Sequence, residues 1–108
     1  MNEELPTNER KFERFSEFYP FYLAQHEEPG TRRMHFIGIS LALTCLLAIF
    51  VTGNPAWFFA AILCGYGFAW IGHAVYEKNL PSSFGHPLYS FMADWRMWLD
   101  MLMGKVSF

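Results

Sequence analysis

The longest uncharged stretch of the chain extends from Met34 to Tyr76, with no Asp, Glu, Lys or Arg over 43 residues. The turn-forming run Thr52-Gly53-Asn54-Pro55 interrupts it near its middle. The apolar arms on either side would be about 26 and about 31 Å long as helices, against roughly 30 Å of bilayer hydrocarbon. We therefore predict an antiparallel hairpin of two transmembrane helices at about residues 35–52 and 56–77.

The segment before the hairpin is predicted to lie at the membrane interface. Aromatic residues mix with charged ones from Phe12 onward, and a helix is expected to start near Glu17 or Pro20. The run Glu27-Glu28-Pro29-Gly30 is expected to end this helix. Thr31 can then cap the first spanning helix.

The segment after the hairpin is predicted to form an amphipathic helix from His86-Pro87 to about Met103. We expect this helix to lie at the interface or to pack on the hairpin. Its apolar side would carry Leu88, Phe91, Trp95, Trp98, Leu99 and Leu102, and its polar side Ser90, Asp94, Arg96 and Asp100.

The predicted fold class is therefore all-α, an integral membrane protein with a two-helix hairpin between an interfacial helix and an amphipathic one. Residues 1–11 are expected to be a flexible cytoplasmic tail, and residues 12–108 a single membrane domain. Hydrophobic residues make up 53 % of the chain and aromatic residues 19 %, an excess that a bilayer explains better than a water-soluble core.

Charge patterning indicates an orientation and excludes one class of partner. Arg32 and Arg33 precede the first arm and Lys78 follows the second, so the positive-inside rule places both termini in the cytoplasm. The net charge is −2 and the basic residues form no stripe, so nucleic acid is not expected as a partner. Cys45 and Cys64 are expected to be apolar packing residues.

The four histidines are predicted to gather at one face of the membrane. His35 lies nineteen residues before Asn54 at the hairpin tip and His73 nineteen after it, so an antiparallel pair of helices brings both to the same depth. His26 and His86 lie just outside the two arms. Ionisable residues at the edge of a spanning helix are costly, and they indicate a functional site by default.

A histidine cluster at this depth is compatible with a metal centre. Imidazole nitrogens suit iron, zinc, copper or nickel, and Glu77 or Asp94 could add a carboxylate ligand or orient a ligating imidazole. Haem held by two of the histidines is an alternative. The alternative interpretation is that the histidines only contact lipid headgroups or cap backbone carbonyls, and that both carboxylates are solvated interfacial charges.

Several stretches resemble a known family, the small membrane proteins named for metabolism of phytosphingosine to odd-numbered fatty acids. The most specific is the block Gly-His-x-x-x-Glu-Lys-Asn-x-Pro that begins at Gly72. The resemblance covers nearly the whole chain, from about Phe12 to Phe108, and the tail is similar to that of bacterial members. It is carried by residues 18–26, 33–38, 65–81 and 86–90.

The resemblance implies an iron(II)-dependent dioxygenase that shortens a 2-hydroxy fatty acid by one carbon with O2. It implies a bacterial inner-membrane location, with His26, His35, His73 and His86 as iron ligands and catalytic residues. We also expect a catalytic role for Glu77 and substrate contacts from Tyr22, Arg33 and Asn79, of which Arg33 could pair with the carboxylate. The competing hypothesis is a non-catalytic membrane protein, either a metal-binding partner subunit or a scaffold.

Overall fold

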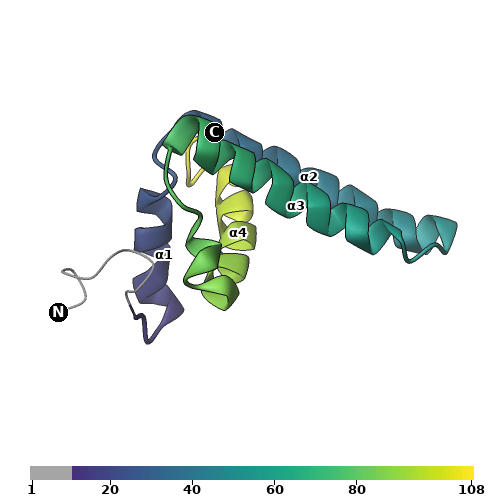
Figure 1. The fold of residues 1–108 in the computed structure, drawn as a ribbon, viewed down its shortest axis with the longest axis horizontal. Helices are drawn as coiled ribbons and strands as arrows, with labels where there is room; N and C mark the ends of the chain where they lie inside the picture. Colours follow the sequence, from purple (N-terminus) through teal and green to yellow (C-terminus); the bar gives the residue numbers. More distant parts are fainter. Residues whose placement is uncertain (1–10) are drawn as a thin grey trace.

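The computed structural model describes residues 11–108, and within that range the chain is all-α, with no strand. The expected tail over residues 1–11 thus lies outside the described residues except for its last position. Two long helices form a hairpin, and two shorter helices stand across its base (Figure 1). The elements are α1 (Phe15–Ala24), α2 (Pro29–Thr52), α3 (Trp57–Gly72), the π-helical turn η3 (His73–Glu77), the 3-10 turn η4 (Ser82–Phe84) and α4 (Pro87–Leu102).

The predicted hairpin is present in α2 and α3, which run side by side along their whole length (Figure 1). Gly53 ends α2 in the left-handed conformation, with φ of 72°, which costs a glycine little. The helices lie close together at Gly38, where an added Cβ would lie 2.8 Å from the Cys64 carbonyl oxygen. Small residues at this contact thus let the two backbones approach closely, whereas helix pairs of soluble proteins usually pack through large apolar side chains.

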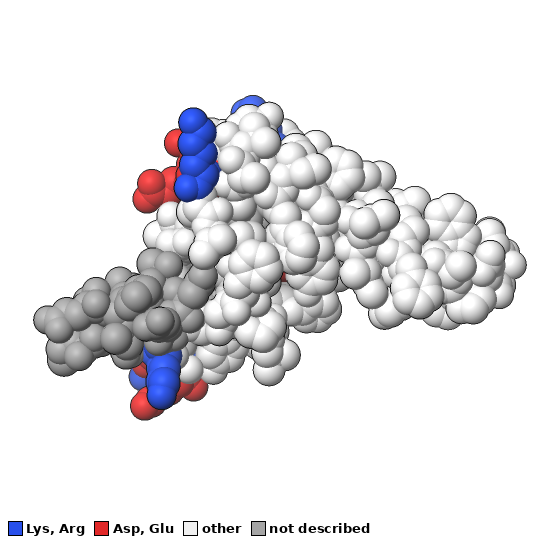
Figure 2. Space-filling model, viewed as in Figure 1, with Lys and Arg blue, Asp and Glu red and all other residues white. Residues whose placement is uncertain are grey.

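Both hairpin helices are long and apolar enough to cross a membrane. Large apolar side chains point outward along them, with Phe50 86 % exposed and Leu63 74 % exposed. Charged side chains gather at the opposite end of the molecule, and none is visible on the outer part of the hairpin (Figure 2). Membrane insertion stays a prediction that this distribution favours.

The start of α2 differs from the expectation. The helix begins at Pro29, with Glu28 as the N-cap, because the fixed φ of proline suits the first helical position. The prediction that Thr31 caps this helix was therefore wrong. The buried Thr31 hydroxyl instead donates a hydrogen bond to the Gly72 carbonyl, 3.4 Å away, and so ties the base of α2 to the end of α3.

The final turn of the second arm is a π-helix, not a continuation of α3. It spans His73–Glu77, and the amides of Lys78 and Asn79 both donate to the His73 carbonyl, at 2.6 and 3.2 Å. Lys78 follows with φ of 60°, the only non-glycine residue with positive φ among those described. This wider turn redirects the chain from α3 toward α1, and it brings Asn79 back to His73.

Helices α1 and α4 pack against each other below the hairpin through Phe18, Phe21, Tyr22, Ala93, Met97 and Met101. The buried side of α4 also carries Ser90 and Asp100, whereas Leu88 and Leu102 are 70 % and 59 % exposed. The face of α4 that meets the protein thus combines apolar residues with Ser90 and Asp100, and several residues of the predicted apolar side face outward. Large apolar side chains on the outer face are unusual for a helix of a water-soluble protein.

Candidate metal centre

Three of the four histidines meet where α1, α2 and the π-helical turn converge. His26 follows the end of α1, His35 lies near the start of α2, and His73 opens the π-helical turn. The Nε2 atoms of His26 and His35 are 3.1 Å apart, and those of His35 and His73 are 3.4 Å apart. All three side chains are at least 96 % buried, with exposed fractions of 1 %, 4 % and 2 %. His35 and His73 thus meet at one end of the hairpin, as their equal spacing from Asn54 predicted.

The outer ring nitrogens of His26 and His73 both face hydrogen-bond acceptors. His26 Nδ1 lies 2.7 Å from the Tyr22 carbonyl oxygen, which can only accept, so Nδ1 carries the hydrogen. His73 Nδ1 lies 2.7 Å from Asn79 Oδ1. The Asn79 amide nitrogen donates to Gln25, which fixes the oxygen toward His73. Nε2 of both imidazoles is therefore left without a proton when the rings are neutral.

His35 is held in the same way by Tyr22 and Asp94. The Tyr22 hydroxyl donates a short hydrogen bond to the Asp94 carboxylate. His35 Nδ1 lies 3.5 Å from the same carboxylate oxygen and 3.4 Å from the Tyr22 hydroxyl oxygen. Because both oxygens are available as acceptors, Nδ1 carries the hydrogen here too, and Nε2 faces the other two histidines with its lone pair.

Three unprotonated Nε2 atoms thus face one another in a buried space, an arrangement that calls for a cation between them. Two nitrogens bound to one metal at about 2.1 Å, with an angle of about 90–110°, would be about 3.0–3.4 Å apart. The two Nε2 separations, 3.1 and 3.4 Å, lie in this range. The donor set and the hydrogen bonds behind it therefore fit a metal ion held by His26, His35 and His73.

Burial governs the protonation of the groups in this centre. It lowers the pKa of His26 well below its usual value, and the neighbouring His35 and His73 lower it further. Burial raises the pKa of the Tyr22 hydroxyl, and it raises the pKa of Asp94 to about 7 against an opposing hydrogen bond from Tyr22. His26 is therefore neutral at physiological pH, the form that binds a metal.

The structure does not bring His86 into this group. Its ring packs against Phe12, Phe18 and Phe21, with centroids 5.2, 5.3 and 6.0 Å away. It also forms the N-cap residue of α4. The role of His86 as an iron ligand, expected from the resemblance, has no support from this arrangement and stays a prediction.

Two other expected site residues serve the fold at the base of α2. Glu77 accepts a hydrogen bond from the backbone amide of Glu28, at 3.1 Å, and so ties the end of the π-helical turn to the start of α2. The exposed Arg33 donates to the Phe108 carbonyl, at 3.1 Å, and its guanidinium lies over the Phe108 ring. Neither side chain reaches the three Nε2 atoms.

Tyr22 and Asn79 do belong to the centre, but behind the histidines. The Tyr22 ring stacks on that of His26, with centroids 4.1 Å apart, and its hydroxyl supports His35 through Asp94. Gln25, which the sequence analysis did not single out, holds Asn79. No periodicity links Gln25 to Asn79, because their contact depends on the π-helical turn.

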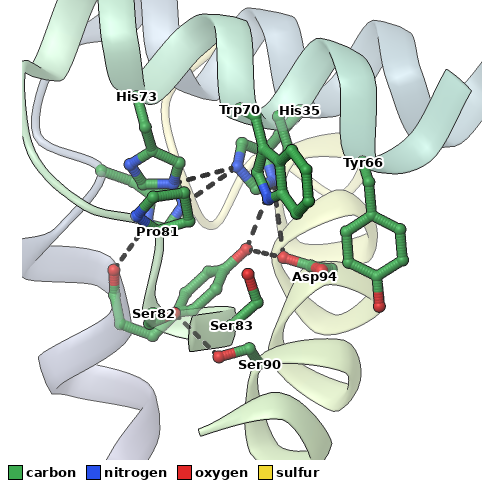
Figure 3. Close-up of a pocket in the computed structure, with 12 residues that line it drawn as sticks. His35, Tyr66, Trp70, His73, Pro81, Ser82, Ser83, Ser90 and Asp94 are labelled. Atoms are coloured by element: carbon green, nitrogen blue, oxygen red, sulfur yellow. Dashed lines mark hydrogen bonds and ion pairs between the residues drawn. The ribbon is translucent and has the colours of Figure 1, made fainter. Parts of the chain in front are cut away.

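A small cavity of about 10 Å³ adjoins the histidines, with room for about one water molecule. Ser82, Ser83 and Ser90 line it from the η4 and α4 side, and Tyr66 and Trp70 from the α3 side (Figure 3). Ser82 and Ser90 hydrogen-bond to each other at 2.8 Å. The Ser83 hydroxyl is buried without a hydrogen-bond partner among residues 11–108. It is the polar group of this cavity that is available to a ligand.

The fold and the site define a class of protein, an all-α protein with a buried three-histidine metal-binding geometry at the base of an apolar hairpin. The chain belongs to the family described as 2-hydroxy-palmitic acid dioxygenase Mpo1-like, whose model matches residues 12–106. The resemblance drawn from the sequence is thus confirmed at the level of the family. No curated protein and no solved structure gave a significant match to the chain.

Proposed function

We propose that this protein is an iron(II)-dependent dioxygenase that uses O2 to shorten 2-hydroxy fatty acids by one carbon. The observation that carries the proposal is the convergence of three unprotonated Nε2 atoms in a chain of this family. The donor set alone suits several metals, and the family description favours iron and a 2-hydroxy fatty acid. Ferrous iron, when bound, would activate O2 and act as a Lewis acid toward the substrate.

The residues of the chain divide into ligands and positioning residues. His26, His35 and His73 hold the metal. Asp94, Tyr22 and Asn79 fix the three rings so that each presents Nε2, and we assign them positioning roles in place of direct substrate contacts. The free hydroxyl of Ser83 is placed to bind the polar end of the substrate in the small cavity beside the histidines.

We further propose that the hairpin spans the membrane with the metal centre at its cytoplasmic face. Two helices of suitable length and the outward-facing apolar side of α4 support insertion. The base of the hairpin carries Arg32, Arg33 and Lys78 and its tip carries no charge, which favours a cytoplasmic base.

The test is oxygen uptake by purified protein loaded anaerobically with ferrous iron, on addition of 2-hydroxyhexadecanoic acid, with mass spectrometry of the product. The proposal predicts uptake, a product one carbon shorter, and loss of both in His35→Ala. Iron binding without uptake for any 2-hydroxy acid would favour a metal-binding partner subunit. Absence of both iron and uptake would overturn the proposal and leave a structural membrane protein.

A further inference from the structure

A second cavity, apolar and much larger, lies in the corner between the hairpin and α4. Its volume is about 330 Å³, within the range of small-molecule sites. Residues of three helices line it: Ile39, Ala42 and Leu46 from α2, Phe58, Ala61, Ile62 and Gly65 from α3, and Phe91 and Trp95 from α4. We call it the corner groove.

At one end the corner groove adjoins the small cavity beside the histidines. His35, Tyr66 and Asp94 line both this groove and the small cavity beside the histidines. From this end to the other, the remaining lining residues are apolar. A site with a single polar end fits a molecule that has one polar end and an otherwise apolar body.

The dimensions of the corner groove fit a single extended chain. His35 and Leu46 mark its two ends on α2, and eleven residues of helix span about 16 Å, the length of roughly a dozen methylene groups. At the far end the groove is lined by Leu46 and Phe58.

The rim of the corner groove is exposed and apolar. Phe58, Ile62 and Phe91 are 51 %, 43 % and 50 % exposed, although each also lines the groove. In a membrane-spanning hairpin this rim would meet lipid chains, and the histidine end would lie near the headgroups. A fatty acid in that leaflet has its carboxyl group near the headgroups and its chain among the lipid chains. Its chain can therefore enter the groove sideways from the bilayer.

From these observations we infer that the corner groove holds the acyl chain of one unbranched fatty acid, with its carboxyl end at the histidines, and that the depth of the groove sets the preferred chain length. The inference rests on the proposed function for the chemistry at the polar end. It assigns the hydrocarbon part of the substrate to a defined part of this chain.

Gly65 offers a way to block the corner groove without disturbing the fold. It lies about halfway along the groove, and a Cβ there would meet only the Ala42 Cβ, at 4.0 Å. Gly65→Leu would place a side chain across the path of the acyl chain and would also favour the helix by about 1 kcal/mol. Gly67→Leu is the matched control, because a Cβ at Gly67 meets nothing within 4 Å and the residue does not line the groove.

The experiment is anaerobic photolabelling in phosphatidylcholine nanodiscs with 2-hydroxyhexadecanoic acid that carries a diazirine near its methyl end. We expect adducts on groove residues around Leu46 and Phe58. Labelling should fall about tenfold or more in Gly65→Leu, the fold-change of about 1.4 kcal/mol of lost binding, and stay unchanged in Gly67→Leu.

Two results would overturn the inference: equal labelling of Gly65→Leu and the unchanged protein, or adducts spread over the outward faces of the hairpin, as for a bulk lipid. Iron content and oxygen uptake of the same samples separate this failure from that of the proposed function. If iron binding and oxygen uptake persist and Gly65→Leu is labelled as strongly as the unchanged protein, only the groove assignment fails. If no sample binds iron or consumes oxygen, the proposed chemistry fails, and the labelling pattern still decides whether the groove binds an acyl chain.

Discussion

At the scale of single residues, the candidate metal centre depends on what lies behind each imidazole. His26 is fixed by a backbone carbonyl, His73 by the Asn79 side chain and His35 by Asp94 with Tyr22. Each partner accepts a hydrogen from Nδ1 and so leaves Nε2 for a metal. Such outer partners commonly change metal affinity by about 10–100-fold when they are removed.

Replacement of Asn79 should therefore weaken metal binding without removing a ligand. Asn79→Ala frees the His73 ring to rotate, and we expect metal affinity to fall about 10–100-fold, measured by competition with a chelator. Asn79→Asp is the control, because it keeps an acceptor for His73 Nδ1 and loses only the bonds to Gln25. Unchanged affinity in Asn79→Ala would show that Asn79 does not orient the ligand.

Tyr22 and Tyr19 form a matched pair for a second test. Both lie on α1, and each hydroxyl donates to a carboxylate of α4, Asp94 for Tyr22 and Asp100 for Tyr19, the latter at 2.8 Å. Tyr22→Phe and Tyr19→Phe should each cost about 1 kcal/mol of the free energy of unfolding, seen in thermal denaturation. Only Tyr22→Phe should also lower metal affinity, because only Asp94 contacts His35. A similar loss of affinity in both variants would indicate a general effect of α1–α4 packing.

At the scale of elements, the close approach of α2 and α3 brings His35 and His73 together. The contact needs a residue without a side chain at Gly38, where a Cβ would also lie 2.9 Å from the Phe68 Cβ. Gly72 has a similar role nearer the site, because a Cβ added there would lie 3.1 Å from the Met34 Cβ. The spacing of α2 and α3 therefore sets the distance between His35 and His73. A change of a few tenths of an ångström in that spacing would move the two ligands relative to each other.

Gly38→Ala should destabilise the hairpin. Backbone atoms of α3 cannot yield as a flexible side chain can, so we expect a loss of about 1–3 kcal/mol in the free energy of unfolding, followed by thermal denaturation in detergent. Gly67→Ala adds the same methyl group in open space and should be neutral or slightly stabilising. Equal stability of the two variants would contradict the close packing at Gly38.

The elements also show what the sequence could predict and what it could not. The uncharged stretch and the turn at Gly53 predicted both hairpin helices, and equal spacing from Asn54 predicted the contact of His35 with His73. The π-helical turn was not predictable, because its hydrogen bonds depend on how Asn79 meets His73 and Gln25. The orientation of α4 was missed for a related reason, since periodicity identifies two faces but not which one meets the protein.

At the scale of the whole molecule, the distribution of polarity favours a membrane protein with its chemistry at one face. Among residues 11–108, the charged side chains visible in Figure 2 lie away from the outer part of the hairpin, which extends as an apolar arm. The centre is buried between the base helices and the hairpin, and the corner groove beside it shares His35, Tyr66 and Asp94 with its cavity. The sequence also placed His86 at the same face as the other histidines, but membrane depth alone does not determine which side chains touch.

The predicted topology can be tested by single-cysteine labelling in membrane vesicles. In a background with Cys45→Ala and Cys64→Ala, Asn54→Cys at the hairpin tip should react with an impermeant maleimide only from the outer side. Lys105→Cys, beyond α4, should react only from the cytoplasmic side. Labelling of both from the same side would contradict a spanning hairpin.

The central claim, that His26, His35 and His73 form the metal centre, is tested most directly by iron content after anaerobic loading with ferrous iron. We predict about one ion per chain in the unchanged protein and its loss in each of the three His→Ala variants. His86→Phe, which keeps a ring against Phe12 and Phe18, should retain the ion. Retention of iron in any of the three His→Ala variants, or its loss in His86→Phe alone, would contradict the account.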